Sequence, residues 1–295
     1  MSAIDEDDHE IEASRAPLLD HLIELRQRLI ICAVALVAGF GLCFGFATQI
    51  YLFLLAPFVR ASNLLAAQHA GHAHGSPFEL LLVVTGFKAA PSIAGAVNMQ
   101  FTEPLEFFFT KVKLAGFGAI VVTFPVLAYE LYRFVAPGLY KRERRAFLPF
   151  LLASPFLFLL GASLVYFIML PFVLWFALNQ QILDSTQVTV HLVTKVSDYL
   201  TLVTSLLLAF GLFFQLPVVM ALLGMSNIVT TKMLTSARRY AVVGVFVVAA
   251  VLTPPDPISM MTLALPGVLL YEISILCVWL IERRKDREAA AEAVG

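Results

Sequence analysis

The run FLPFLLASPFLFLLGASLVYFIMLPFVL, residues 147–174, contains no charged side chain. A helix needs roughly 20 predominantly apolar residues to cross the hydrocarbon core of a bilayer, and this run is long enough to do so. Its apolar residues are continuous rather than alternating with polar ones, which disfavours a membrane β-barrel. The stretch therefore predicts a transmembrane helix and sets the class of the whole chain.

Further apolar runs lie on both sides of this one. We place six spans, at about 29–50, 107–134, 147–174, 198–224, 237–252 and 258–281. Of the 295 residues, 60% are hydrophobic and 14% are charged, whereas a soluble domain carries about 25% charged residues. Prolines recur inside the spans, so we expect kinked helices; they are Pro125, Pro155, Pro171, Pro217 and Pro266. The predicted fold class is an all-α membrane protein.

The distribution of basic residues predicts the orientation of the spans. Of the 20 Lys and Arg residues, the segments on one side of the predicted membrane hold Arg60, Lys88, Lys111, Lys113 and Lys195. The remainder lie in the amino-terminal segment, the 2–3 and 4–5 loops and the tail. Lys and Arg accumulate on the cytoplasmic side of membrane proteins. We therefore expect both termini in the cytoplasm, which agrees with six spans.

The segments outside the spans differ in composition. Residues 1–16 are rich in Asp and Glu and lack the basic start of a cleavable signal peptide, so we expect a disordered acidic leader. The membrane domain is then 17–281, and 282–295 forms a cytoplasmic tail. The first outer loop, 51–106, is too apolar for a plain linker. We expect it to cap the outer face with short strands or an interfacial helix, and its histidines His69, His72 and His74 to occupy a solvated loop tip rather than a metal site.

Motifs for several common chemistries are absent from the sequence. There is no GxxxxGK[ST] phosphate loop, no HExxH zinc motif and no GxSxG nucleophile elbow. The three cysteines fall in apolar runs without CxxC spacing, as small buried side chains do. We therefore expect no catalytic residues, metal site or cofactor, and no enzymatic activity. A solute transporter and a structural scaffold are two functions compatible with this composition.

Two segments on the predicted inner side place a carboxylate among bases. In PLLDHLIELRQRLI, residues 17–30, the leucines form one apolar face of a helix that we expect to lie along the membrane surface, and Glu24 stands beside Arg26 and Arg28. In KRERR, residues 141–145, the acid is Glu143. One interpretation is local salt bridges such as Glu24–Arg28, worth about 0–1 kcal/mol when exposed. The other is that both carboxylates receive a guanidinium ligand, whose planar fork suits a carboxylate.

Several longer motifs resemble the TatC family, the multi-spanning core subunit of the twin-arginine protein translocase. They are HLIELRQRL (21–29), FTEPLEFFFTKVKLA (101–115), FPVLAYELYRFVAPGLYKRERR (124–145), FGLFFQLPV (210–218) and LTPPDPIS (252–259). The resemblance extends from about residue 17 to 282, in the same order and with the same six spans.

The resemblance implies a cupped, concave inner-membrane protein that binds twin-arginine signal peptides and helps to export folded proteins. Glu24 and Glu143 would engage the two signal arginines, and the residues shaping the site would be Arg26, Phe134, Pro137 and Tyr140. Because no nucleotide site is present, energy would come from the proton-motive force. The partners would be the single-span subunits TatA and TatB along the fifth and sixth spans, in a multimeric complex in the lipid bilayer, with no nucleic acid.

Other polar residues have less specific expectations. Gln215 stands where relatives often carry Glu, and it either makes a helix–helix hydrogen bond or contacts a partner helix. Glu272 is a candidate for a partner interface, and Glu130 is expected to be a solvated carboxylate near an inner span end. On the outer side we expect structural roles for Pro57, Pro104, Lys113 and Asp256, with Lys113 reaching the headgroups and Asp256 capping the sixth helix.

Overall fold

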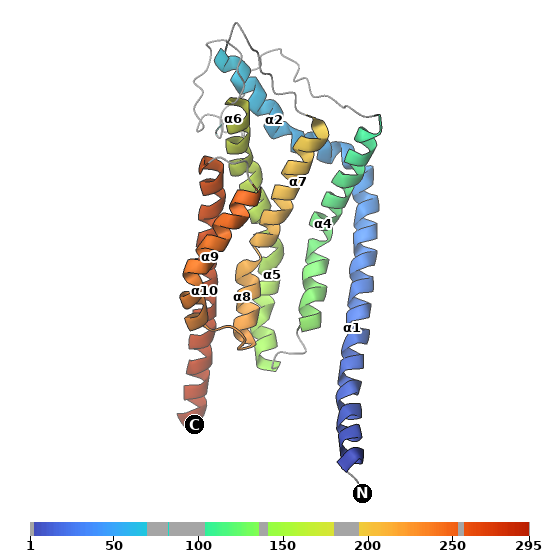
Figure 1. Ribbon diagram of the computed structural model, residues 1–295, viewed down its shortest axis with the longest axis vertical. Helices are drawn as coiled ribbons and strands as arrows, with labels where there is room; N and C mark the ends of the chain where they lie inside the picture. Colours follow the sequence, from blue (N-terminus) through green and yellow to red (C-terminus); the bar gives the residue numbers. More distant parts are fainter. Residues whose placement is uncertain are drawn as a thin grey trace.

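The structure is a computed structural model that describes the backbone of residues 3–69, 82, 104–135, 141–179, 195–252 and 257–294, and the side chains of most of these between 22 and 287. The elements within these ranges are helical (Figure 1). In chain order they are α1 (Ala3–Gly45), α2 (Ala47–His69), α4 (Glu106–Val135), α5 (Lys141–Leu164), the π-helical η2 (Val165–Met169), α6 (Leu170–Asn179), α7 (Val196–Phe213), α8 (Leu216–Met225), α9 (Thr231–Leu252) and α10 (Pro257–Val294).

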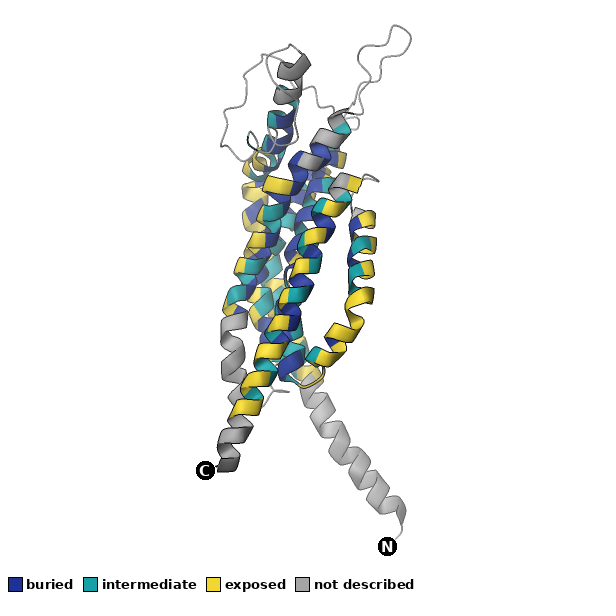
Figure 2. Cartoon of the chain, turned by 90° about the vertical axis from the view of Figure 1, so that its left-hand side faces the viewer, coloured by how far each residue is buried: buried dark blue, intermediate teal, exposed yellow. Residues whose placement is uncertain are grey.

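Among the described residues, six helical stretches are long and apolar enough to cross a membrane, which matches the predicted number of spans. They are Leu22–Gly45, Glu106–Phe134, Leu151–Met169, Val196–Met225, Thr231–Val251 and Met260–Arg287. Both chain ends lie at the same end of the bundle (Figure 1). Buried residues gather where the helices face one another, and exposed ones lie along the outer helix faces (Figure 2).

The first helix differs from its prediction at both ends. Residues 17–30 do not form a separate surface helix but continue in line with the span, because residues 18–45 contain no proline to interrupt α1. Residues 3–16, predicted to be disordered, belong to the same helix. The span ends at Gly45 rather than at 50, because the chain turns at Phe46 into α2.

Helix α2 occupies the first part of the predicted outer cap 51–106; beyond it, residue 82 and residues 104–106 are the cap residues that the structure describes. The helix crosses the upper end of the bundle obliquely (Figure 1). Its residues Leu54, Phe58 and Ala61 are 1%, 5% and 0% exposed and belong to the main core cluster. The spacing of four and three residues places them on one helix face, which anchors α2 to the spans.

Pro57 lies inside α2 and has no N–H to donate to the carbonyl of Phe53, four residues earlier. The hydroxyl of Tyr166 donates to that carbonyl at 2.8 Å, and the hydroxyl of Tyr199 donates to the next one, of Leu54, at 2.9 Å. Tyr166 of η2 thus replaces the bond that the proline removes, and the two tyrosines together fix α2 to both spans.

The third and fourth spans are interrupted near prolines. The third changes to the π-helical η2 just before Pro171, which cannot donate to the carbonyl of Phe167. The fourth is divided into α7 and α8 at Phe214 and Gln215, and Pro217 lies in the first turn of α8. Proline at this position is tolerated because its N–H would have no partner within the helix.

Helices α5 and α7 approach each other closely at two glycines. A Cβ atom on Gly161 would lie 2.7 Å from the backbone oxygen of Phe210, and one on Gly211 would lie 2.5 Å from the ring of Phe158. The Phe158 ring stacks on Phe124 with ring centroids 4.2 Å apart. Glycine therefore allows α5 and α7 to pack around buried aromatic rings, as small residues do between membrane helices.

Candidate functional site

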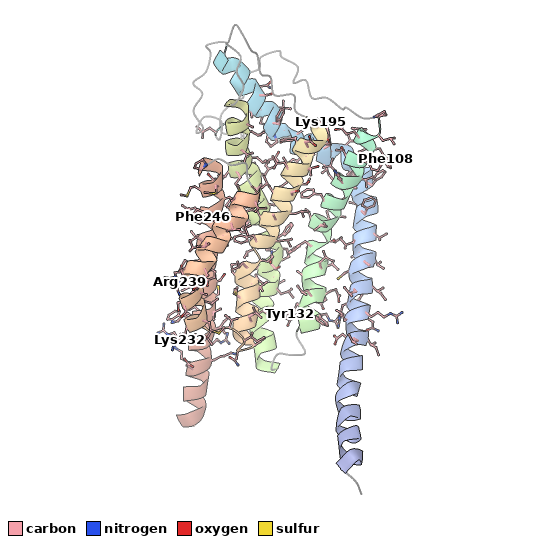
Figure 3. The ribbon with its side chains drawn as sticks, in the orientation of Figure 1. Phe108, Tyr132, Lys195, Lys232, Arg239 and Phe246 are labelled. Atoms are coloured by element: carbon pink, nitrogen blue, oxygen red, sulfur yellow. The ribbon has the colours of Figure 1, made fainter. Side chains whose placement is uncertain are left out.

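A cluster of charged side chains joins α1 to α4 near the end of the bundle that carries the chain termini. Arg28 Nη2 donates to Glu24 Oε1 at 3.0 Å, and Arg28 Nη1 donates to Glu130 Oε2 at 3.0 Å. The exposed fractions of the side chains are 16% for Arg28, 31% for Glu24 and 7% for Glu130. Tyr132, two residues from Glu130, lies at this lower end, opposite Phe108 and Lys195 (Figure 3). We call Glu24, Arg28 and Glu130 the charged triad.

The helices position the triad in a simple way. Glu24 and Arg28 are one turn apart on α1, so their side chains lie on the same face. Helix α4 runs alongside α1 (Figure 1) and presents Glu130 opposite Arg28. The two helices approach closely at Gly39, where an added Cβ would lie 2.7 Å from the Thr123 methyl group. This contact brings a carboxylate of α4 within reach of an arginine of α1.

The triad carries a net charge of −1, since one guanidinium faces two carboxylates. Arg28 Nε is buried and has no hydrogen-bond partner among the described residues. An unsatisfied buried donor costs about 1–3 kcal/mol. Arg28 therefore pairs with both acids, while its Nε donor has no partner among the described residues.

The predicted Glu24–Arg28 salt bridge is present. The expectation for Glu130 was wrong, because it is buried and ion-paired rather than solvated. The proximity of Glu130 to the membrane surface could be read from the sequence, but the packing of α4 against Arg28 could not.

The other residues predicted for the signal-peptide site are only partly described. Arg26 is exposed on α1, and Phe134 is half-buried on α4, one turn beyond Glu130. Glu143 lies in the first turn of α5, and its side chain is outside the described set. Pro137 and Tyr140 lie outside the described residues. The structure therefore brings Glu24 together with Arg28 and Glu130. That Glu24 and Glu143 lie close together stays a prediction.

Gln215 makes the interhelical hydrogen bonds that were one of its two predicted roles. Its Oε1 accepts from Ser154 Oγ at 2.6 Å, and its Nε2 donates to the Ser154 backbone oxygen at 2.9 Å. Gln215 stands at the break between α7 and α8, so the pair ties this interruption of the fourth span to α5. The carboxamide satisfies both the hydroxyl and the carbonyl of one residue.

Replacing Gln215 with Ala is expected to lower the free energy of unfolding by about 1–3 kcal/mol, because both hydrogen bonds are lost in an apolar setting. Thermal unfolding of the purified protein in detergent measures this loss. Ser154→Ala removes only the hydroxyl bond and should cost less. Equal stability of Gln215→Ala and the parent protein would contradict the structural role.

Polar contacts also join α9 to α10. Arg238 Nη2 donates to Glu272 Oε2 at 2.8 Å, with 51% and 43% of these side chains exposed. Glu282 accepts from the backbone N–H of Thr231 at 2.9 Å and from its hydroxyl, and thereby caps the start of α9. A carboxylate at this position complements the helix dipole. Glu272, predicted at a partner interface, is thus paired within the chain on an exposed face.

The predicted outer residues take separate places. Pro104 lies in an exposed turn just before α4, and Lys113 is exposed on the second turn of that helix. Asp256 lies outside the described residues. Sequence reasoning missed Glu106, which is buried at the start of α4 and accepts a hydrogen bond from Ser197 Oγ at 2.5 Å. No group of three or more metal-ligating side chains occurs within the searched, described part of the chain.

Within the described part of the chain, six helices long and apolar enough to span a membrane, with an ion-paired cluster at the end where both termini lie, are typical of a multi-pass helical membrane protein. A family model described as Sec-independent protein translocase protein (TatC) matches residues 20–266. The chain belongs to the TatC family. It is therefore a component of the Tat protein translocase in the inner membrane, acts with other Tat subunits, and falls in a family of transport proteins rather than a known enzyme family.

Individual relatives agree with this assignment. The chain is 38% identical to the TatC protein of Magnetococcus marinus over 94% of this chain and 89% of the relative. It is 36% identical to that of Aquifex aeolicus, over 91% and 97% respectively. It is 33% identical to that of Escherichia coli K12, over 88% and 86%. A crystal structure described as the twin arginine translocase receptor TatC matches with a TM-score of 0.67 and 32% identity, covering 89% of this chain and 99% of that one.

Proposed function

We propose that this chain is the receptor for twin-arginine signal peptides within its translocase, with Glu24 and Glu143 receiving the two arginines. The observation that carries the proposal is the partly exposed Glu24 carboxylate, held at the end of the bundle near which α5 begins with KRERR. A similar solved protein is described as a translocase receptor. Arg26, Phe134, Pro137 and Tyr140 shape the same site.

The chemistry of Glu24 suits this role. Its Oε1 atom is bonded to Arg28, and about a third of its side chain is exposed, since the structure gives 31%. A guanidinium can approach the exposed edge and donate charge-assisted hydrogen bonds. Each such bond contributes about 1.5–3 kcal/mol, so two arginines give about 3–6 kcal/mol, near millimolar affinity. The apolar segment of the signal peptide supplies the remaining affinity by lying against the spans in a cupped face.

The rest of the proposal concerns orientation, partners and energy. Both termini lie in the cytoplasm, which suits their common position at one end of the bundle (Figure 1). Single-span TatA and TatB subunits dock along α9 and α10, where Val243, Val251 and Leu265 are 61%, 79% and 68% exposed. Gln215 and Glu272 remain candidate polar contacts for such helices. The proton-motive force drives export of folded cargo.

Photocrosslinking of a signal peptide to the protein in native membranes tests the receptor role. Peptides with an Arg-Arg and a Lys-Lys pair are compared on the parent chain and on Glu24→Ala and Glu143→Ala. We expect crosslinking to require both arginines and to fall about tenfold or more in each variant, since each loses a charge-assisted contact. Asp286→Asn, which removes an exposed carboxylate on α10 across the bundle from α1, serves as the matched control. Equal crosslinking of all four proteins, or of both peptides, would overturn the proposal.

A further inference from the structure

The Glu24 carboxylate that should receive a signal arginine already contacts an arginine of its own chain. Arg28 donates to it at 3.0 Å through Nη2, and donates to Glu130 at the same distance through Nη1. The two bonds leave from different nitrogens. One can therefore break while the other persists, with Arg28 remaining ion-paired throughout.

We propose that Arg28 is a resident guanidinium that holds Glu24 in the empty receptor and is exchanged for a signal-peptide arginine on binding. Glu130 is then a positioning residue, because it keeps Arg28 ion-paired after Glu24 has bound the signal-peptide arginine. The inference rests on the proposed receptor function and adds to it a third carboxylate and an intramolecular competitor.

Burial gives the exchange a direction. The exposed side-chain fraction rises from 7% at Glu130 through 16% at Arg28 to 31% at Glu24. The Glu24 end of the triad is therefore the one that an incoming peptide can reach, and the Glu130 end is shielded. Because Arg28 bonds Glu130 through Nη1, it keeps a buried counter-ion when the Nη2 bond to Glu24 is released.

Charge favours the same exchange. Two carboxylates around one guanidinium leave a net charge of −1, which one signal arginine neutralises. After exchange each carboxylate holds one guanidinium: Glu24 holds the ligand, and Glu130 holds Arg28. A lysine ammonium can balance the charge, but it lacks the planar fork through which a signal arginine can donate two parallel hydrogen bonds to Glu24.

The proposal predicts that one substitution weakens peptide binding and that a second substitution restores it. In Glu130→Gln the triad loses its negative charge and Arg28 is left with Glu24 as its sole counter-ion. The Kd for an Arg-Arg peptide should rise about tenfold, the loss of roughly one charge-assisted contact. In the double variant Arg28→Gln/Glu130→Gln, Glu24 keeps a net charge of −1 and has no internal competitor. Its Kd should return to the parent value or below.

The experiment measures the Kd of a fluorescent Arg-Arg signal peptide for the purified protein in lipid nanodiscs, at several salt concentrations. Asp286→Asn is again the control. The salt dependence of Kd should weaken in Glu130→Gln and recover in the double variant, which a purely structural defect would not produce. Thermal unfolding without peptide checks that each variant is folded.

Two results would overturn the exchange while leaving the receptor function intact. One is a Glu130→Gln variant that binds like the control although Glu24→Ala does not bind. The other is a folded double variant that stays as weak as Glu130→Gln. Failure of the receptor function itself is recognised separately, because the parent protein would then bind Arg-Arg and Lys-Lys peptides alike and Glu24→Ala would bind like the parent; that result overturns both.

Discussion

Replacing Arg28 with Ala is expected to lower the free energy of unfolding clearly more than breaking an exposed ion pair does, because it leaves a buried carboxylate uncompensated. Glu130 is the reason for the large effect. Its side chain is 7% exposed, and Arg28 is the counter-ion that the structure places beside it. Unpaired charge inside a membrane protein is more costly still when water cannot reach it.

A matched comparison separates burial from charge. Arg238→Ala breaks an ion pair of similar length, 2.8 Å to Glu272, whose side chains are about half exposed, with 51% and 43% accessible. Exposed pairs contribute about 0–1 kcal/mol, so this variant should stay close to the parent. Thermal unfolding in detergent, followed by loss of the monodisperse protein peak, measures both. Equal losses in the two variants would show that the triad is solvated.

The second large effect is expected at the crossing of α5 and α7. A Cβ on Gly161 would lie 2.7 Å from the backbone oxygen of Phe210 and 2.8 Å from the ring of Phe214. No side-chain rotation relieves a clash with a backbone atom, so the helices must separate. Gly161→Ala should destabilise the protein by about 1–3 kcal/mol, as overpacked cores do, and Gly161→Val by more.

Gly116→Ala is the natural control for this prediction. It also adds a methyl group to a glycine in the middle of a spanning helix, but nothing lies within 4 Å of the new Cβ. Helix propensity then favours alanine by about 1 kcal/mol. The same thermal measurement should rank Gly116→Ala at or above the parent. A Gly161→Ala protein as stable as Gly116→Ala would refute close packing at the crossing.

Much of the fold could be predicted because bilayer crossing imposes a length and a composition on each segment. The uncharged run 147–174 and its neighbours indicated six spans, and six helices of sufficient length and apolar composition occur among the described residues. The ends of the spans were predicted less well. The turn at Phe46 is an example, since apolar residues continue through it into α2. The hydrogen bonds from Tyr166 and Tyr199 that fix α2 against the spans come from distant parts of the chain.

Only the contacts of the candidate site that lie within a single helix could be predicted. Glu24 and Arg28 are four residues apart, so their pairing follows from helix geometry. Glu130 is 102 residues from Arg28, and its partner depends on how α1 and α4 pack. Glu106 and Ser197 show the same limit, with 91 residues between them. Contacts across the bundle are set by the fold as a whole and leave no local signal.

The place of Arg28 between a near and a distant acid has a consequence for the order in which the protein is made. Helix α1 leaves the ribosome before α4 and must enter the bilayer without it. Its arginine is then already balanced by Glu24 one turn away, so the newborn helix carries no uncompensated charge from this pair. When α4 follows and packs against α1, Glu130 forms its ion pair with Arg28. The arrangement spares α1 from inserting an unbalanced arginine, and it offers Glu130 a guanidinium to pair with once α4 packs against α1.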